Sequence, residues 1–504
     1  MQFELLGKRR AGMLAHVTSL PGPHGHGDLG PSAFAFVDFL AAAGQSVWQM
    51  LPVSPPGFGA SPYDSPSTNA GSPWLISLEQ LQRDGLLSKT ETRAPQHLQK
   101  TSAQLGKSQL FRERLLRVAF ARYQDANIHE PRALTNFRHA ERGWLSDHCL
   151  FLALKHAARG AHWTQWDGPL RKRSRTALLR AQDELAQEVA FHEWVQFVFD
   201  TQWRALAAHC KRQGVALLGD VPMFVAHDGV DTWAQQRLFR LDKRGNKRVS
   251  AGVPPDAFSE TGQLWGNPVY DWKAMQRDQF AWWVARFRRG VDMFDVLRLD
   301  HFIGFHRCYE IPADAQDARR GRFVRVPGEA LFEQVGKALG GLPFLAEDLG
   351  IVTAEVVALR DALQLPGMRV LQFAFGDPNG SDYLPHRYPS STAVYTGTHD
   401  NDTTLGWYRS LGRTAAGRAE KQRVHAYLGP SRDPLHLQLI RLAYASVADL
   451  AVIPLQDALG LGQKSRMNVP GTSRGNWSWR FTRRDLTARL AARLRTLAAS
   501  YERT

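Results

Sequence analysis

Apolar stretches alternate with amphipathic ones along most of this chain, and the alternation predicts its fold. Eight stretches are typical of buried strands: Met13–Val17, Ser46–Val53, Val215–Pro222, Met293–Asp300, Pro343–Asp348, Met368–Phe375, Ala393–Thr396 and Leu450–Leu455. Helical patterns separate most of them, although the pattern between the sixth and seventh is weak. We therefore expect an α/β fold, a (β/α)8 TIM barrel, with an open doubly wound sheet as the alternative.

Two long segments interrupt this alternation. Residues 78–180 are charged and rich in Leu and Ala at helical spacing, which predicts a mainly helical insertion subdomain between the second and third strands. A further segment, about 222–275, follows the third strand and predicts loop insertions. The expected division is a catalytic barrel made of 1–77 and 181–504, and a helical insertion made of 78–180.

Acidic residues lie at the ends of five predicted strands: Asp220, Asp300, Glu347, Asp400 and Asp457. A barrel would bring all of these strand ends to one rim, which favours the barrel over the open sheet. Arg298 and Asp300 are two residues apart on one strand, so they share a face, and the arginine favours the ionised carboxylate. A structural ion pair at a strand end is the alternative interpretation.

Paired carboxylates on adjacent strands are what glycoside chemistry requires. Retaining enzymes hold two carboxyl groups about 5–5.5 Å apart, one as nucleophile and one as acid/base. Asp300 beside Arg298 suits the nucleophile. Glu347 follows apolar residues and lies near other anions, so its pKa should be raised, which suits the acid/base. Strand parity does not decide between Glu347 and Asp348.

Composition narrows the class of protein to which the chain is expected to belong. Hydrophobic residues make up 43% of the 504 residues and charged residues 22%, which predicts a sizeable folded core. The formal net charge of +15 allows an acidic partner, but no nucleic-acid-binding motif accompanies it, so we expect no nucleic acid. No stretch is long and apolar enough for a membrane span, and Met1–Arg10 lacks the apolar segment of a signal peptide. Three dispersed cysteines favour a reducing compartment, and we expect a cytoplasmic protein.

Short motifs along almost the whole chain resemble those of the amylomaltases, the bacterial 4-α-glucanotransferases of the α-amylase superfamily. Those before the predicted active site are TSLPG (18–22), GDLG (27–30), SPYDS (61–65), GDVP (219–222), VPPD (253–256) and GQLWGNP (262–268). Those at and after it are RLDH (298–301), AEDLG (346–350), GTHDN (397–401) and MNVPG (467–471).

The resemblance implies a role for each matching residue. Asp300 corresponds to the catalytic nucleophile, Glu347 to the general acid/base and Asp400 to the carboxylate that binds sugar hydroxyls. The substrate-binding residues that it implies are Tyr63, Asp220, Trp265, Arg298, His301, Asp377, His399 and Asn468. Asp256 and Phe258 match an acceptor-side loop, in which Ala257 replaces the family's usual tyrosine.

The function expected from the resemblance is transfer of α-1,4-glucan segments between malto-oligosaccharides through a covalent glucosyl intermediate on Asp300. The scheme requires no metal and no other cofactor, and its partners are α-1,4-glucans. An α-1,4-glucan hydrolase on the same barrel is one alternative, and a non-catalytic glucan-binding scaffold is another. The oligomeric state does not follow from the sequence.

Overall fold

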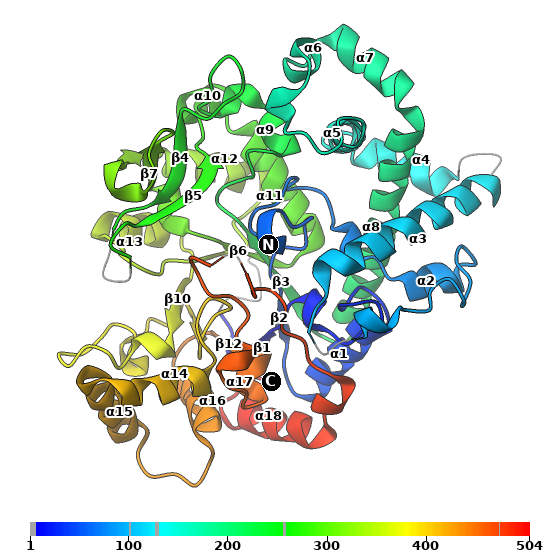
Figure 1. Ribbon diagram of the computed structural model, residues 1–504. Helices are drawn as coiled ribbons and strands as arrows, with labels where there is room; N and C mark the ends of the chain where they lie inside the picture. Colours follow the sequence, from blue (N-terminus) through cyan, green and yellow to red (C-terminus); the bar gives the residue numbers. More distant parts are fainter. Residues whose placement is uncertain (1–6, 100–101, 127–130, 256–258, 473) are drawn as a thin grey trace.

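Eight parallel strands form a nearly closed barrel at the centre of the molecule (Figure 1). The computed structural model describes residues 7–99, 102–126, 131–255, 259–472 and 474–504. Hydrogen bonding orders the strands β10-β11-β12-β1-β2-β3-β6-β9, and the amide of Ala346 in β9 donates to the carbonyl of Pro366, just before β10, at 2.9 Å. The barrel strands are β1 (Arg10–Leu14), β2 (Val47–Gln49), β3 (Ala216–Val221), β6 (Val296–Leu299), β9 (Phe344–Ala346), β10 (Gly367–Val370), β11 (Thr392–Tyr395) and β12 (Leu450–Pro454).

The predicted (β/α)8 barrel is thus confirmed, with differences at some strand ends. Every residue of β6, β9, β11 and β12 is buried, as expected for parallel strands covered on both faces. The first strand lies earlier than predicted and ends at Leu14. The sixth ends at Val370, because Leu371–Phe373 forms a 3-10 helix instead of continuing the strand.

Helices surround the barrel. Among the described residues between β10 and β11, only 3-10 turns occur, which agrees with the weak helical pattern there. The helices outside the predicted insertion are α1 (Pro31–Ala42), α8 (Ala186–Arg212), α9 (Val230–Ala234), α10 (Trp272–Arg277), α11 (Ala281–Met293), α12 (Gly328–Leu339), α13 (Ala354–Ala362), α14 (Thr404–Ser410), α15 (Ala415–Leu428), α16 (Leu435–Ala445), α17 (Leu455–Ala458) and α18 (Ala488–Ser500).

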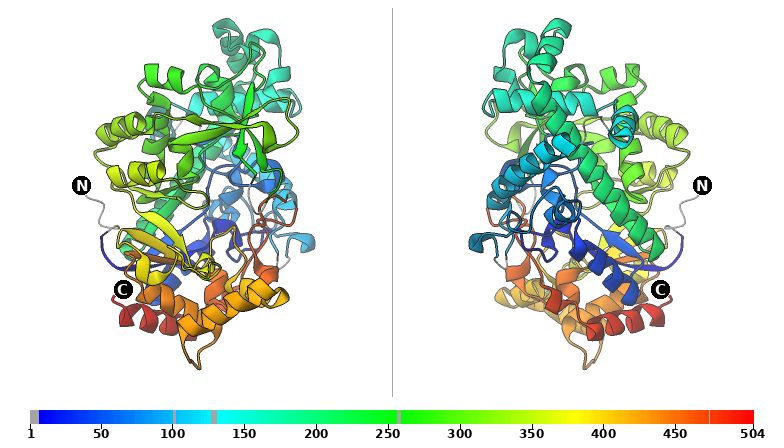
Figure 2. Two further views of the ribbon diagram at one scale, coloured as in Figure 1. Left: turned by 90° about the vertical axis from the view of Figure 1, so that its left-hand side faces the viewer. Right: turned by 90° about the vertical axis from the view of Figure 1, so that its right-hand side faces the viewer.

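The segment predicted as a helical insertion does contain helices. They are α2 (Leu78–Arg83), α3 (Leu105–Ala126), α4 (Arg132–Ala140), α5 (Leu145–Ala157), α6 (Gly168–Arg171) and α7 (Arg175–Glu184). Figures 1 and 2 show them, coloured blue to teal, on one side of the barrel beside the long helix α8. The division of the chain into a barrel and an insertion subdomain remains a prediction.

A second, antiparallel sheet replaces part of the segment predicted as loops. Its strands are β4 (Val249–Val253), β5 (Gln263–Pro268), β7 (Arg307–Pro312) and β8 (Arg322–Arg325), in the order β5-β4-β7-β8. The segment predicted as loop insertions, about 222–275, thus contains two strands of this sheet, β4 and β5, while β7 and β8 come from after β6. The strands are short, and β5 and β8 are largely exposed, so they lack the apolar pattern that marks the barrel strands. Among the described residues no helix has the length and hydropathy of a membrane span.

Candidate active site

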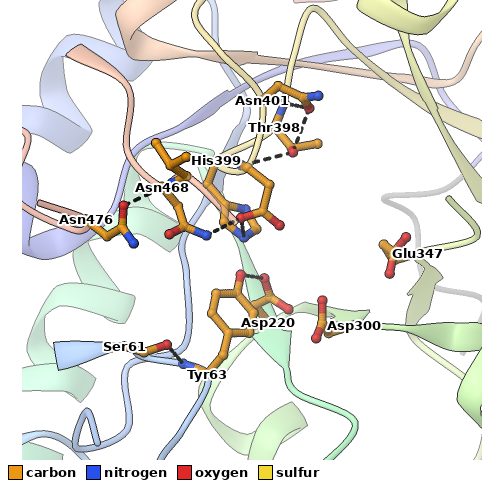
Figure 3. Close-up of polar contacts among 12 residues, drawn as sticks. Ser61, Tyr63, Asp220, Asp300, Glu347, Thr398, His399, Asn401, Asn468 and Asn476 are labelled. Carbon is orange, nitrogen blue, oxygen red and sulfur yellow. Dashed lines mark hydrogen bonds and ion pairs between the residues drawn. The ribbon is translucent and has the colours of Figure 1, made fainter. Parts of the chain in front are cut away.

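One buried guanidinium connects the carboxylates that end three adjacent barrel strands. Arg298 Nη1 lies 2.8 and 2.9 Å from the two carboxylate oxygens of Asp220, at the end of β3, and 3.0 Å from Asp300 Oδ1, after β6. Its Nη2 lies 3.9 Å from Glu347 Oε2, after β9. Since β3, β6 and β9 are neighbours in the sheet, the barrel itself brings the three acids together (Figure 3).

Burial and charge act in opposite directions on this group. Burial alone would lower the pKa of the Arg298 guanidinium, but the carboxylates of Asp220 and Asp300 raise it well above its ordinary value. Burial raises the pKa of Asp220, and Asp300 adds to that effect while Arg298 opposes it. Arg298 therefore stays charged and compensates only part of the negative charge around it.

Glu347 has a raised proton affinity. Burial, with a further contribution from the nearby Asp300 and against the opposing effect of Arg298, raises the pKa of its carboxyl group to about 8. Its oxygens accept hydrogen bonds from the backbone N–H groups of His301 at 2.7 Å and Leu349 at 2.9 Å. A carboxyl group with this pKa, held in place from two sides, can give up and take back a proton near neutral pH.

The open choice between Glu347 and Asp348 is resolved by their directions. Asp348 is buried and turned toward α13, where its Oδ2 lies 2.5 Å from Arg360 Nη1. Its Oδ1 accepts from the amide of Met368 in β10 at 2.7 Å. Asp348 thus joins β9, β10 and α13, whereas Glu347 faces the rim.

Asp400 faces the same space from the end of β11. Asn468 Nδ2 donates to Asp400 Oδ1 at 2.6 Å, and His399 Nε2 lies 3.4 Å from the same oxygen. The ring of His399 stacks on Tyr63 with centroids 5.1 Å apart and planes 10° apart. The hydroxyl of Tyr63 in turn donates to Asp220 Oδ2 at 2.7 Å, which links Asp400 to the Arg298 group (Figure 3).

His301 connects this group to the antiparallel sheet. It has a left-handed backbone, with φ of 50°, and in this conformation its N–H points at Glu347. Its ring makes a T-shaped contact with Trp265, from β5, with ring centroids 5.0 Å apart and planes at 87°. Trp265 is 37% exposed, so an indole face remains available beside the carboxylates. Such faces suit the apolar side of a sugar ring.

These residues line a cleft of about 1050 Å³. The cleft is large for a single small molecule, and both aromatic rings and polar side chains line it. Among the described residues, no group of three or more His, Cys, Asp or Glu side chains has an arrangement that could hold a metal ion. The arrangement can therefore bind an extended polyhydroxylated ligand and attack it with paired carboxyl groups.

Comparison with known proteins agrees with this chemistry. Residues 15–487 match the model of a protein family described as 4-alpha-glucanotransferase. The chain belongs to this family. It is 45% identical to a 4-alpha-glucanotransferase of Thermus thermophilus, over 98% of this chain and 99% of that one. It is 44% identical to one of a Synechocystis species, over 99% of each. The structure is also similar to that of an amylomaltase from Streptococcus agalactiae in complex with acarbose, with a TM-score of 0.94, 36% identity, and coverage of 98% of this chain and 100% of that one.

For this 4-alpha-glucanotransferase family member, most of the residues predicted for the site lie together. Those that line the cleft are Tyr63, Trp265, Asp300, His301, Glu347, His399, Asp400 and Asn468. Asp220 and Arg298 lie directly beneath, in contact with Asp300 or Tyr63. Asp457 is on the rim but turns inward to Thr396 and Thr404, outside the cleft lining. Asp377 is exposed and does not line the cleft, and Asp256, Ala257 and Phe258 lie outside the described residues.

Several other residues that line the cleft were not predicted from the sequence. Trp477 lies 5.9 Å from Tyr63 and 6.2 Å from His399, ring to ring, and Phe58 is 80% exposed at the cleft. His162 and His227 also line the cleft. An aromatic residue in a short run of small or polar residues, as in Gly-Phe-Gly (57–59) and Gly-Asn-Trp-Ser (475–478), is a weak signal for such a position. Nothing in the sequence connects His162 with His227.

Proposed function

We propose that this member of the 4-alpha-glucanotransferase family transfers α-1,4-glucan segments between malto-oligosaccharides by a retaining double displacement. The observation that carries the proposal is the pairing at Arg298: Asp300 is in contact with the guanidinium, and the nearby Glu347 carboxyl has a pKa raised to about 8. One acid is thus held beside a permanent cation and the other retains its proton near neutral pH. This is the division of roles that a retaining mechanism needs.

In the first step Asp300 attacks the anomeric carbon while Glu347 protonates the departing glycosidic oxygen. The bond between the anomeric carbon and that oxygen breaks, and a β-linked glucosyl ester with Asp300 forms. Glu347, now ionised, then takes the proton from the 4-hydroxyl of an incoming glucan. That oxygen attacks the anomeric carbon, Asp300 leaves, and the α-1,4 linkage is restored.

The remaining residues bind and orient the sugar in this proposal. Asp400, held by Asn468 and His399, would accept hydrogen bonds from the hydroxyls of the reacting unit. Tyr63 and Trp265 would supply the aromatic faces. Roles for Asp377, Asp256 and Phe258 are kept as predictions. The proposal includes a cytoplasmic location, supported by three buried free cysteines, and a helical insertion subdomain over 78–180.

Incubation with maltotriose tests the reaction and separates it from hydrolysis. Transfer produces glucose and a ladder of longer oligosaccharides with a constant number of reducing ends. Hydrolysis shortens the substrate and adds one reducing end per cleavage, which would overturn the proposal. Replacing the proposed nucleophile, Asp300→Asn, should lower the rate more than about 10⁴-fold, whereas Asp314→Asn, which changes an exposed carboxylate, should not change it. If rearrangement survives in Asp300→Asn, the nucleophile is wrongly assigned.

A further inference from the structure

Two imidazole rings line the cleft where the helical insertion meets the barrel. His162 precedes the 3-10 helix Trp163–Gln165, and His227 follows β3 in the segment 222–229. Their ring centroids are 4.7 Å apart, with planes at 54°. The charged groups that act on the two rings are Asp228, Lys155 and Lys247, which differ from those that surround Arg298. The pair is therefore a separate part of the cleft wall.

Three segments are fixed to one another at this place. The indole N–H of the buried Trp163 donates to the carbonyl of His227 at 2.7 Å. Lys155 Nζ lies 2.6 Å from Asp228 Oδ2. Gly245, with φ of 86°, packs so closely that a Cβ there would lie 2.2 Å from the Trp163 ring. The two imidazoles are thus held in position before any ligand binds, which lowers the cost of binding.

Hydrogen bonds assign the protons of the two rings. The backbone N–H of Thr164 donates to His162 Nδ1 at 3.2 Å, so the proton of the neutral ring is on Nε2. His227 Nε2 lies 2.8 Å from the carbonyl oxygen of Gly245, so this nitrogen carries the proton and donates it, and Nδ1 is the acceptor. The pair therefore offers one donor and one acceptor through the nitrogens that these two bonds do not use.

Both rings are neutral near pH 7, because burial lowers the pKa of His162 and lowers that of His227 to about 4. The side chains around them balance in charge, since Lys155 and Lys247 face Asp64 and Asp228. An anionic ligand would find no net positive charge here. A neutral donor beside a neutral acceptor instead matches two adjacent hydroxyl groups of a glucosyl unit, each of which can donate and accept.

The cleft wall is continuous between this pair and the catalytic group. Trp265 touches His301, and the next residue, Gly266, accepts a hydrogen bond from Lys247 Nζ at 2.5 Å. Lys247 also lines the cleft and acts electrostatically on both imidazoles. A glucan chain that lies over Trp265 can thus extend to the pair.

We propose that His162 and His227 form an additional glucosyl-binding subsite, which favours longer malto-oligosaccharides over short ones. The proposal rests on the proposed function, since it names a subsite for the same substrate. A chain that reaches the pair gains its hydrogen bonds, whereas a short substrate bound at Asp300 does not. The subsite therefore sets a preference for chain length and leaves the chemical step unchanged.

The test compares kcat/KM for maltoheptaose and for maltotriose in His162→Ala. The ratio of the two constants should fall about fivefold, the equivalent of one neutral hydrogen bond, through a higher KM for maltoheptaose. His162→Gln, whose amide can donate from near the position of Nε2, should restore part of the ratio. His156→Ala, which removes an exposed histidine of the same insertion, should leave it unchanged.

The outcomes are distinct. An unchanged ratio in His162→Ala, or an equal loss for both substrates, would overturn the subsite, and so would a failure of His162→Gln to differ from His162→Ala. If instead the wild-type protein produces no ladder from maltotriose, the proposed function fails. Thermal unfolding of each variant shows whether a loss comes from folding, and His162→Gln provides the comparison if His162→Ala is unstable.

Discussion

Glu347 and Asp348 are neighbours at the end of β9, yet their carboxylates lie in opposite electrostatic surroundings. On the rim side, Glu347 shares a single guanidinium, Arg298, with Asp220 and Asp300. On the outer side, Asp348 contacts two guanidiniums, Arg360 at 2.5 Å and Arg369 at 3.5 Å, and it shares only the first of them, with the exposed Asp361. Three acids thus share one cation on the rim side, whereas two acids share two cations on the outer side.

The difference shows which region is arranged for chemistry and which for stability. The Asp348 carboxylate is hydrogen-bonded through both oxygens, to Arg360 and to the amide of Met368, so it holds β9, β10 and α13 together. Glu347 instead keeps a high affinity for protons, because burial, together with the nearby Asp300, raises its pKa to about 8 against the one cation that it shares with two other acids. Substitutions in the two regions should therefore separate activity from stability.

The largest effect is expected for Glu347→Gln. The amide cannot transfer a proton to the leaving oxygen, so kcat with maltotriose should fall about 10²–10⁴-fold. The wild-type rate should decline as pH rises through about 8, because Glu347 then loses the proton that the first step needs. That decline should be absent from the residual activity of the variant. A pH-rate profile of both proteins checks this, and an unchanged decline in Glu347→Gln would assign it to another group.

The adjacent change, Asp348→Asn, should instead reduce stability. It leaves the buried guanidinium of Arg360 without its closest partner, which should lower the free energy of unfolding by about 3 kcal/mol. The kcat with maltotriose, measured well below the unfolding transition, should stay within about threefold. Asp361→Asn is the matched control, because Asp361 binds the same arginine from an exposed position. This change should lower the free energy of unfolding by less than about 1 kcal/mol. Lost activity without lost stability in Asp348→Asn would contradict the comparison.

The sequence predicts the barrel well because the barrel strands are buried on both faces. Apolar runs such as Leu450–Leu455 allow few other structures, and the acids after them mark the rim. The antiparallel sheet escaped prediction because strands such as β8 are short and face solvent, so burial does not constrain their sequence. That Trp265, on β5 of this sheet, belongs to the site could be reached only through the family resemblance, and its contact with His301 comes from the structure.

The directions of side chains are the other part that a sequence alone does not provide. Whether Glu347 or Asp348 faces the rim depends on where β9 ends and how the chain turns, and the Arg360 contact decides it. Likewise, His162 and His227 come from different parts of the fold, and contacts of Trp163 and Lys155 with the 227–228 segment bring them together. Asp457 had the sequence position of a rim acid, and the structure turns it away from the cleft.

The smallest effect on activity is expected for Asp457→Asn, which tests whether a rim acid must face the cleft to support catalysis. Asp457 lies on the rim, as Glu347 does, but its Oδ2 accepts from the hydroxyls of Thr396 at 2.6 Å and Thr404 at 2.8 Å. In Asp457→Asn these hydroxyls can rotate and accept from the new amide group, so most of the network can persist. Burial also raises the pKa of the Asp457 carboxyl group. The free energy of unfolding of the wild-type protein therefore falls as pH rises above the ordinary pKa of an aspartate. The asparagine side chain does not titrate, so the variant avoids this loss. We therefore expect a change of only about 1 kcal/mol in the free energy of unfolding at neutral pH, with kcat unchanged. Denaturant unfolding and the maltotriose assay check both, and a loss of kcat here would mean that a rim acid can support catalysis without facing the cleft.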